Sequence, residues 1–404
     1  MNKILLLIID GLGDRPSDIF RRRTPLEEAK TPLMDRLARE GSVGLIKPFQ
    51  RGLFPTSEDA HFTLFGYDVN HYQIGRGVFE ALGLELELND HSVAWRGNWA
   101  TLDRSGRILD RRAGRIPASE EMIDQIRDLT IDGVRFRIYP GLEHRLVVIM
   151  EGEGLSDQVS DGYRRQVGVP PSLITPLDRS EEANFTARLV NRYLNQIHSS
   201  LKNNPANQER IRQNQPPVNY ILLRGAGRIK TAPSFKEQWG WSGACVAAGP
   251  LYRGVSKFVG LKIIDVPGVT AGIDTNLDGK IKAAIEALSE HDFVFCHIKA
   301  TDSLSHMRDC QGKLNFLEKI DQSLSSLFSQ TGVTLILTGD HATPCETGEH
   351  SSDLIPMLVW GDQVPKDKVT RFGESFCAKG GLGAWNQIQV LEETAKLTKG
   401  NGKS

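Results

Sequence analysis

A carboxylate and two imidazoles lie close together in residues 338–350, in a pattern that can bind a metal ion. Asp340, His341 and His350 follow the apolar run 333–337, which is typical of a buried strand bounded by glycines. A parallel sheet presents its ligands beyond the carboxyl ends of its strands, so a site is expected here. One carboxylate and two imidazoles suit Zn²⁺ or Mn²⁺. The alternative is a turn capped by Asp340 with two histidines on the surface.

Two further segments repeat this pattern of an apolar run that ends near an acidic residue. Residues 293–298 are followed by Asp302 and His306, which one helical turn would place on the same face. Residues 4–9 form another apolar run, and Asp10 stands at its end. Each occurrence alone is weak, but three strands that end in acids predict one shared metal site.

Residues 55–61 form a polar loop that could supply a nucleophile. A serine hydroxyl is a poor nucleophile unless a base or metal lowers its pKa, and a two-metal site can bind both the attacking oxygen and the phosphoryl oxygens. Ser57 is therefore the candidate nucleophile, and His61 is a candidate to orient or protonate a substrate oxygen. The alternative for Ser57 is a helix N-cap, with Glu58 and Asp59 favouring the helix dipole. A lone loop histidine is otherwise structural or exposed.

The elements that must position these residues alternate between strand and helix at both ends of the chain. This alternation predicts a three-layer α/β/α core around a mostly parallel sheet. The predicted core strands are residues 4–9, 220–223, 245–248, 293–298, 333–337 and 354–360. The predicted core helices are residues 32–40, 277–289, 314–328 and 386–397.

The middle of the chain has a different pattern and predicts an inserted α+β domain. Its predicted strands are residues 93–102 and 145–150, and its predicted helices are residues 120–129 and 183–197. We predict a core of residues 1–74 and 178–404, and a substrate-binding or lid domain of residues 75–177. A lid could exclude water and favour phosphoryl transfer over hydrolysis. Residues 202–217, rich in Asn, Gln and Pro, are expected to be a hinge or surface loop.

A group of arginines in the inserted region could bind the anionic groups of a substrate. They are Arg107, Arg111, Arg112 and Arg115. A guanidinium can bind a phosphate or carboxylate with two parallel hydrogen bonds. The alternative is a solvated arginine-rich turn. Lys299, next to the segment of Asp302, could neutralise a transferring phosphate or pair with a core carboxylate.

Composition excludes several other functions. The 49 basic and 50 acidic residues create no field that would attract nucleic acid or an anionic membrane. The run 4–9 is too short to span a bilayer and lacks a signal-peptide cleavage pattern, so the cytoplasm is the expected compartment. Five cysteines without a Cys-x-x-Cys pair argue against a disulfide framework. Cys345, inside the candidate metal segment, is expected to be a small packing residue.

Several longer motifs, in order along nearly the whole chain, resemble the archaeal-type cofactor-independent phosphoglycerate mutases of the alkaline phosphatase superfamily. The motifs are residues 10–16, 24–32, 75–83, 110–116, 223–227, 297–300, 338–350 and 380–383. The resemblance implies an isomerase that interconverts 3-phosphoglycerate and 2-phosphoglycerate without 2,3-bisphosphoglycerate. Ser57 would carry the phosphoryl group as a phosphoserine. The only partner implied is a small phosphorylated acid, with no nucleic acid and no membrane.

The resemblance also implies two divalent metal ions, most often Mn²⁺, with Mg²⁺, Zn²⁺ or Co²⁺ as substitutes. The ligands of one ion would be Asp302, His306 and His350. The ligands of the other ion would be Asp10, Ser57, Asp340 and His341. His61, Arg111, Arg112, Arg115 and Lys299 would contact the substrate.

The chain departs from the family pattern near the nucleophile and in the substrate half. The usual Pro-Gly-Ser-Asp-Thr-Ala-His is Pro-Thr-Ser-Glu-Asp-Ala-His at residues 55–61, and Thr56 cannot freely take the positive φ open to glycine. Residues 160–165 replace the usual Ser-Asp-Thr-Asp-Pro-His. All seven expected ligands are present, which favours phosphoryl chemistry. The alternatives are a phosphohydrolase or phosphonate-cleaving enzyme, a small-metabolite phosphotransferase, and a non-catalytic binding protein.

Overall fold

The computed structural model describes residues 3–49, 55–116 and 120–398, and the chain divides into two compact units. The first unit consists of Met1–Tyr72 and Ala232–Ser404, so both ends of the sequence build it. The second unit is continuous, from Gln73 to Thr231. Across the described ranges, no helix is long and apolar enough to cross a membrane.

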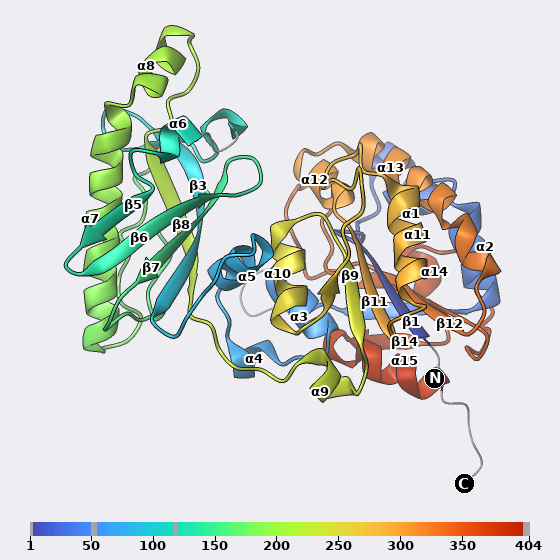
Figure 1. Cartoon of the computed structure of the whole chain (residues 1–404). Helices are drawn as coiled ribbons and strands as arrows, with labels where there is room; N and C mark the ends of the chain where they lie inside the picture. Colours follow the sequence, from blue (N-terminus) through green and yellow to red (C-terminus); the bar gives the residue numbers. More distant parts are fainter. Residues whose placement is uncertain (1–2, 50–54, 117–119, 399–404) are drawn as a thin grey trace. The chain divides into compact units, whose positions relative to one another are not determined.

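An eight-stranded sheet forms the centre of the first unit, in the order β10-β9-β11-β1-β12-β13-β2-β14 (Figure 1). Its strands are β1 Lys3–Ile9, β2 Ser42–Lys47, β9 Gly243–Val246, β10 Lys262–Ile263, β11 Phe293–Ile298, β12 Val333–Thr338, β13 Ile355–Trp360 and β14 Gly383–Asn386. Neighbouring strands are parallel except at β13, which runs against both of its neighbours. Residues 4–9 of β1 are apolar and fully buried, as expected for a central parallel strand.

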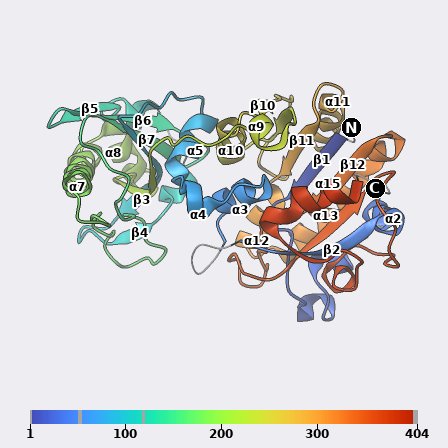
Figure 2. The same cartoon turned by 90° about the horizontal axis from the view of Figure 1, so that it is seen from below.

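Helices cover both faces of this sheet, which confirms the predicted α/β/α core (Figures 1 and 2). They include α2 Pro32–Glu40, α11 Leu277–Ala287 and α13 Cys310–Ser323 on one face, and α3 Ser57–Leu64 and α10 Pro250–Phe258 on the other. The first three helices contribute buried side chains to the same hydrophobic core cluster as Leu5 and Leu7 of β1. On the opposite face Phe65, at the end of α3, packs edge-on against Phe295 of β11.

The first unit also contains further helices and 3-10 turns. They are η1 Asp18–Phe20, α1 Pro25–Glu28, α4 Val69–Tyr72, α9 Phe235–Trp239, α12 Ala300–His306, η3 Leu324–Ser329, α14 Glu374–Cys377, η4 Gln387–Gln389 and α15 Val390–Thr398. The sequence did not predict β2 or β14. Both strands contain glycine, which weakens a strand pattern. Gly44 is needed in β2 because a Cβ there would lie 2.6 Å from the carbonyl oxygen of Gly383 in β14.

The second unit is built on an antiparallel six-stranded sheet, in the order β4-β3-β7-β6-β5 with β8 also paired to β3. Its elements are α5 Arg76–Gly83, β3 Ser92–Leu102, β4 Ile108–Asp110, η2 Ala113–Arg115, α6 Glu120–Ile123, β5 Asp128–Ile131, β6 Val134–Pro140, β7 Arg145–Glu151, α7 Glu181–Lys202, α8 Pro205–Arg212 and β8 Tyr220–Gly227. Alternate residues of β3 face opposite sides. Trp95 and Trp99 join the core beneath α7, whereas Ala94 packs with Ala81 of α5.

The second unit extends further along the chain than the predicted boundary at residue 177. Strand β8, expected in the core sheet, pairs with β3 instead, with Leu223 opposite Gly97. Helix α7 packs on the same sheet, where Tyr193 stacks on Phe136 with ring centroids 4.3 Å apart. These contacts place residues up to Thr231 in the second unit. The lid role given to this unit stays a prediction.

Two local predictions in this region were wrong. The helix expected over residues 120–129 ends at Ile123, and β5 begins at Asp128 because it pairs with β6. Residues 202–217 contain α8 rather than only a loop. The side chain of Asn204 accepts a hydrogen bond from the backbone N–H of Ala206, and Pro205 occupies the first helical turn, so both residues favour this helix start.

A partly buried carboxyl group at the start of α14 predicts a pH-dependent stability. Glu374 accepts hydrogen bonds from the Asp14 backbone N–H at 3.1 Å and from Thr24 Oγ1 at 2.6 Å. Burial raises the pKa of Glu374 from 4.5 to about 7, against the hydrogen bond from Thr24, which lowers it. The folded chain therefore keeps this proton to higher pH than the unfolded chain. The stability it contributes is complete below pH 4.5 and is lost as the pH rises through 7.

Glu374→Gln mimics the protonated group, so its free energy of unfolding should not fall with pH in this range. In the wild type this fall is on the order of 3 kcal/mol. The measurement is the free energy of unfolding by denaturant between pH 4.5 and 8. Glu290→Gln, at an exposed position, is the control and should keep the wild-type profile. Equal pH profiles for Glu374→Gln and the wild type would contradict the prediction.

Candidate metal centre

The expected acidic ligands meet at the carboxyl ends of three neighbouring strands. Strand β1 lies between β11 and β12, so the residues after all three strands lie at one edge of the sheet. Asp10 follows β1, and Asp340 and His341 follow β12. Helix α12, after β11, carries Asp302 and His306 one turn apart. Parallel pairing therefore brings together residues that are far apart in the sequence.

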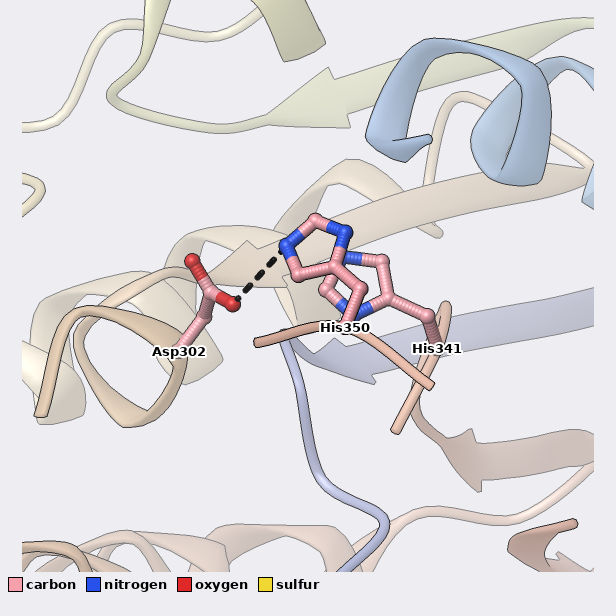
Figure 3. A group of neighbouring side chains, drawn as sticks. All are labelled: Asp302, His341 and His350. Atoms are coloured by element: carbon pink, nitrogen blue, oxygen red, sulfur yellow. Dashed lines mark ion pairs between the residues drawn. The ribbon is translucent and has the colours of Figure 1, made fainter. Parts of the chain in front are cut away.

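Two overlapping groups of these side chains have donor atoms close enough to hold metal ions. Asp302, His341 and His350 form one group, and Asp10, Asp340 and His341 form the other. Within each group the donor atoms lie within 4.8 Å of one another. Figure 3 shows the stacked rings of His341 and His350, with centroids 3.7 Å apart, and the ion pair from His350 to Asp302. His341 is common to both groups.

Backbone carbonyls orient the two histidines nearest Asp302. His306 Nδ1 lies 2.7 Å from the Gly348 carbonyl oxygen, and His350 Nδ1 lies 2.9 Å from that of Pro55. A carbonyl oxygen only accepts, so each Nδ1 carries the proton and each Nε2 faces the site. Both Nε2 atoms are 3.4 Å from a carboxylate oxygen of Asp302. A hydrogen bond from Nδ1 to a carbonyl oxygen commonly fixes the orientation and the tautomer of a histidine that binds a metal through Nε2.

The donor set fits a divalent cation. Asp10 Oδ1 and Asp340 Oδ2 are buried and have no hydrogen-bond partner among the described residues. Buried carboxylate oxygens are normally hydrogen-bonded or bound to a metal. Burial raises the pKa of Asp340 well above its usual range, and the Asp10 carboxylate adds to this effect. Carboxylates and imidazoles together suit a borderline transition metal.

Three side chains bind the other oxygen of Asp10, and the sequence identified only one of them. Asp10 Oδ2 accepts from Tyr252 at 2.6 Å, from His297 Nε2 at 3.0 Å and from Lys299 Nζ at 3.0 Å. Burial acts most strongly and would raise the pKa of Asp10, but the Lys299 ammonium and the contacts with His297 together outweigh burial, and the pKa falls below its ordinary value. Lys299 also pairs with Asp302, so this ammonium lies among the candidate ligands. His297 belongs to the motif of residues 297–300, which was the available signal.

Ser57 lies at this centre as the first residue of α3. Its Oγ is 3.3 Å from His341 Nε2. Thr56 is the N-cap: its side chain accepts from the Asp59 backbone N–H and its φ is −106°, so no positive φ is required there. A helix does begin in this loop, but the N-cap alternative for Ser57 was wrong by one residue, because Thr56 is the N-cap. The nucleophilic role of Ser57 stays a prediction.

His61 is completely buried one turn after Ser57. Its Nδ1 lies 2.7 Å from the Ser57 carbonyl oxygen and 3.6 Å from Asp340 Oδ2. Burial lowers the pKa of His61 to about 4, so the ring is neutral near pH 7. The structure places His61 against the backbone of Ser57, and the contact of His61 with substrate stays a prediction.

A disulfide joins Cys310, at the start of α13, to Cys345. The expectations of no disulfide and of an unpaired Cys345 were therefore wrong. Cys345 lies in the loop between His341 and His350, and its backbone N–H also donates to the Asp14 carboxylate at 3.1 Å. The bond thus ties this loop to the segment that follows α12. The remaining cysteines, Cys245, Cys296 and Cys377, are free and buried.

The predicted arginines lie in the second unit. Arg107 directly precedes β4, and the other three lie in and after the turn that follows β4. Asp110 Oδ1 accepts from the Arg112 backbone N–H at 2.8 Å, which closes this turn. Arg111 Nη1 donates to the Tyr163 hydroxyl at 3.1 Å. Burial and then the charge of Arg115 lower the pKa of Arg112, so these guanidinium groups are close.

A second set of arginines, which the sequence did not single out, lies on the α5 face of this sheet. Arg96 of β3 stands directly opposite Arg224 of β8, and Arg145 of β7 stands opposite Asn98 of β3. Glu80 of α5 is 3.6 Å from Arg96 Nε. The Nε atoms of Arg96 and Arg145 are buried without a hydrogen-bond partner among the described residues. Burial, then Arg224, lowers the pKa of Arg96 well below its usual value.

The buried His144 connects the two sets of arginines. Burial, then the charges of Arg145 and Arg112, lowers its pKa to about 3. Arg96 and Arg115 contribute in the same direction. The second unit therefore concentrates positive charge around a neutral histidine.

Comparison with known proteins gives a consistent relationship along the whole chain. A family model described as the metalloenzyme superfamily matches residues 2–394. The 2,3-bisphosphoglycerate-independent phosphoglycerate mutase 1 of Methanocaldococcus jannaschii is 43% identical over 99% of this chain and 98% of its own length. The corresponding mutase of Thermoplasma volcanium is 40% identical over 98% of this chain and 97% of its own length.

Two solved structures agree with this relationship. A protein from Pyrococcus horikoshii has a TM-score of 0.83 and 32% identity, covering 100% of this chain and 99% of its own. The cofactor-independent phosphoglycerate mutase of Thermoplasma acidophilum has a TM-score of 0.67 and 34% identity, covering 98% of this chain and 100% of its own. The chain belongs to the metalloenzyme superfamily and, within it, to the family of 2,3-bisphosphoglycerate-independent phosphoglycerate mutases.

Proposed function

We propose that the protein interconverts 3-phosphoglycerate and 2-phosphoglycerate without 2,3-bisphosphoglycerate, as the names of its relatives describe for them. The observation that carries the proposal is the place of Ser57. Its hydroxyl oxygen lies 3.3 Å from Nε2 of His341. His341 belongs to both groups of donor atoms that could hold a metal ion. A serine hydroxyl beside such a donor set is placed to act as a nucleophile.

The reaction would proceed in two transfers through this one oxygen. Ser57 Oγ attacks the phosphorus of 3-phosphoglycerate, the bond from the C3 oxygen to phosphorus breaks, and the serine proton ends on the C3 oxygen. The bound glycerate reorients. Its 2-hydroxyl then attacks the phosphoserine phosphorus, and its proton returns to Ser57 Oγ as that bond breaks. The phosphoryl group moves within one molecule of substrate, so no second phosphate donor is consumed.

We propose two divalent ions at this centre, Mn²⁺ in the first instance, with Mg²⁺, Zn²⁺ or Co²⁺ as substitutes. Asp302, His306 and His350 would hold one ion, and Asp10, Ser57, Asp340 and His341 the other. When bound, the ions supply positive charge that stabilises a deprotonated serine oxygen and the phosphoryl oxygens. Lys299, 3.0 Å from Asp10, adds an ammonium to this environment. The neutral His61 would keep the backbone of Ser57 in place.

The second unit would bind the anionic groups of the substrate. Like charges directly opposite on paired strands are destabilising, yet Arg96 and Arg224 occupy such a pair. Glu80, the carboxylate 3.6 Å from Arg96 Nε, is shared with Arg76 at 3.1 Å, and the Nε atoms of Arg96 and Arg145 lack hydrogen-bond acceptors among the described residues. A phosphate or carboxylate would satisfy these donors. Arg111, Arg112 and Arg115 would extend this set.

Arg145→Gln is expected to raise KM for 3-phosphoglycerate about 10–100-fold, because a hydrogen bond to a charged group is lost. Metal content should stay at the wild-type level. The melting temperature should be unchanged or higher, since the change relieves repulsion among guanidinium groups. Steady-state kinetics and a thermal melt measure both effects.

Arg135→Gln is the matched control, because Arg135 is an exposed arginine of the same sheet that pairs with Asp128. It should leave KM unchanged. If KM in Arg145→Gln equals the wild-type value, Arg145 does not bind the substrate. A lowered melting temperature with unchanged KM would identify it as a structural residue.

The proposed activity is tested by incubating the purified protein with Mn²⁺ and 3-phosphoglycerate, without bisphosphoglycerate. Both 2-phosphoglycerate and free phosphate are followed. Formation of 2-phosphoglycerate with little free phosphate is the expected result. Free phosphate alone would identify a phosphohydrolase at the same centre and would overturn the mutase proposal.

A further inference from the structure

The side chain of Thr343 contacts one candidate ligand of each metal ion. Its Oγ1 lies 2.9 Å from Asp302 Oδ1 and 3.1 Å from His341 Nδ1. Asp302 belongs to one proposed ligand set and His341 to the other. Thr343 is fully buried, so this hydroxyl has no access to solvent as an alternative partner.

The proton on this hydroxyl determines the tautomer of His341. A hydroxyl has one proton to donate, and an ionised carboxylate can only accept. The Thr343 proton is therefore committed to Asp302, and Oγ1 must accept from His341 Nδ1–H. His341 Nε2 therefore carries no proton, and its lone pair is available to a metal ion. The same Nε2 lies 3.2 Å from Asp340 Oδ2 and 3.7 Å from Asp10 Oδ1.

The backbone around Thr343 is held in place on both sides. Its N–H donates to the Gly13 carbonyl oxygen at 2.9 Å, and its own carbonyl oxygen accepts from the buried Lys313 Nζ at 3.2 Å. Gly11 leaves room for the hydroxyl, because a Cβ there would come within 2.8 Å of Thr343 Oγ1, and its φ of +65° favours glycine. The threonine thus occupies a fixed position between the two ligands.

We propose that Thr343 is a positioning residue that couples the two metal sites. Its single hydroxyl orients Asp302 for one divalent cation and sets the metal-binding tautomer of His341 for the other. Loss of the hydroxyl therefore weakens both sites together. This inference rests on the proposed two-metal function, and it assigns a role to a side chain that is not itself a ligand.

The test is a titration of metal-free protein with Mn²⁺, read by calorimetry and by elemental analysis, for the wild type, Thr343→Ser and Thr343→Val. The wild type should bind two ions per chain. Thr343→Ser keeps the hydroxyl and should bind within about threefold of the wild type. Thr343→Val removes it at nearly constant volume and should bind about 10–100-fold more weakly in both steps, the usual effect of losing an outer partner of a ligand.

Thr338→Val is the matched control. Thr338 is also fully buried, but its hydroxyl donates to the Pro356 carbonyl oxygen at 2.9 Å. The same chemical change there should leave both binding steps at wild-type strength. Equal weakening in Thr338→Val and Thr343→Val would show a general packing effect and overturn the proposal.

A measurement on the wild type alone keeps the proposal testable if Thr343→Val does not fold. Nitrogen NMR of ¹⁵N-histidine-labelled, metal-free protein should show His341 protonated at Nδ1 and bare at Nε2. A proton on Nε2 would overturn the tautomer argument.

The results that would overturn this inference differ from those that would overturn the proposed function. Two ions in the wild type with unchanged binding in Thr343→Val would overturn only the role of Thr343. Weakening of a single binding step in that variant would overturn the coupling. A wild type that binds no divalent ion would overturn the two-metal function and the inference with it.

Discussion

Ser57→Ala is expected to lower kcat for the conversion of 3-phosphoglycerate by at least on the order of 10⁴-fold, because loss of a serine nucleophile removes the covalent route entirely. Metal content should fall little, since three carboxylates and three histidines remain at the centre. The melting temperature should stay close to that of the wild type. Kinetics, elemental analysis and a thermal melt of the same preparation measure these three quantities. Incubation of the wild type with substrate should also add one phosphate to Ser57, detectable by mass spectrometry.

Ser323→Ala is the control for this change. Ser323 is as buried as Ser57, and its hydroxyl donates to the Ile320 carbonyl oxygen of α13 at 2.7 Å. Its kcat should equal that of the wild type. Near-normal turnover in Ser57→Ala would exclude a phosphoserine and require direct transfer or a different nucleophile.

His341→Ala is expected to reduce metal binding at both sites by more than the roughly 100-fold seen when only an outer partner is lost. The reason is that His341 is a proposed ligand of one ion, and its donor atom also lies within 4.8 Å of those of Asp302 and His350, the proposed ligands of the other ion. It also removes the contact between Nε2 and Ser57 Oγ. Metal per chain after dialysis, measured by elemental analysis, should fall from two to below one, and turnover should fall with it.

His71→Ala is the matched control. His71 is an exposed histidine of the same unit, stacked edge-on against Tyr72. It should retain both ions and full activity. Undiminished metal in His341→Ala would overturn the ligand assignment, whereas loss of metal in both variants would indicate general damage to the unit.

The core sheet was predictable because its central strands are buried on both faces. Such strands are continuous apolar runs, and β1, β11 and β12 all have this form. The acidic residues at their ends were then predictable from topology alone. The boundary of the second unit was not predictable in this way. Helix α7 is amphipathic, and its pattern of apolar residues does not show which of the two sheets it covers. The register of β8 against β3 decides that question, and no local signal encodes it.

Contacts between residues that are far apart in the sequence could not be predicted from it. Arg96 and Arg224 are single charges in separate strands, and only their register makes them neighbours. Cys310 and Cys345 have no recognisable spacing, and only the fold brings the loop between His341 and His350 next to the start of α13. Disulfides are uncommon in the cytoplasm of most organisms, so the expected compartment stays a prediction.

The division of the first unit between the two ends of the chain has a consequence for synthesis on the ribosome. Asp10 and Ser57 emerge first, but β1 has no neighbouring strand until β11 and β12 have been made. The second unit, continuous from Gln73 to Thr231, contains its whole sheet and can fold in the interval. The serine thus leaves the ribosome long before His341 and His350 exist. Under the proposed mechanism, a nascent chain would carry Ser57 without the charges that activate it until the segment of His341 and His350 has been made.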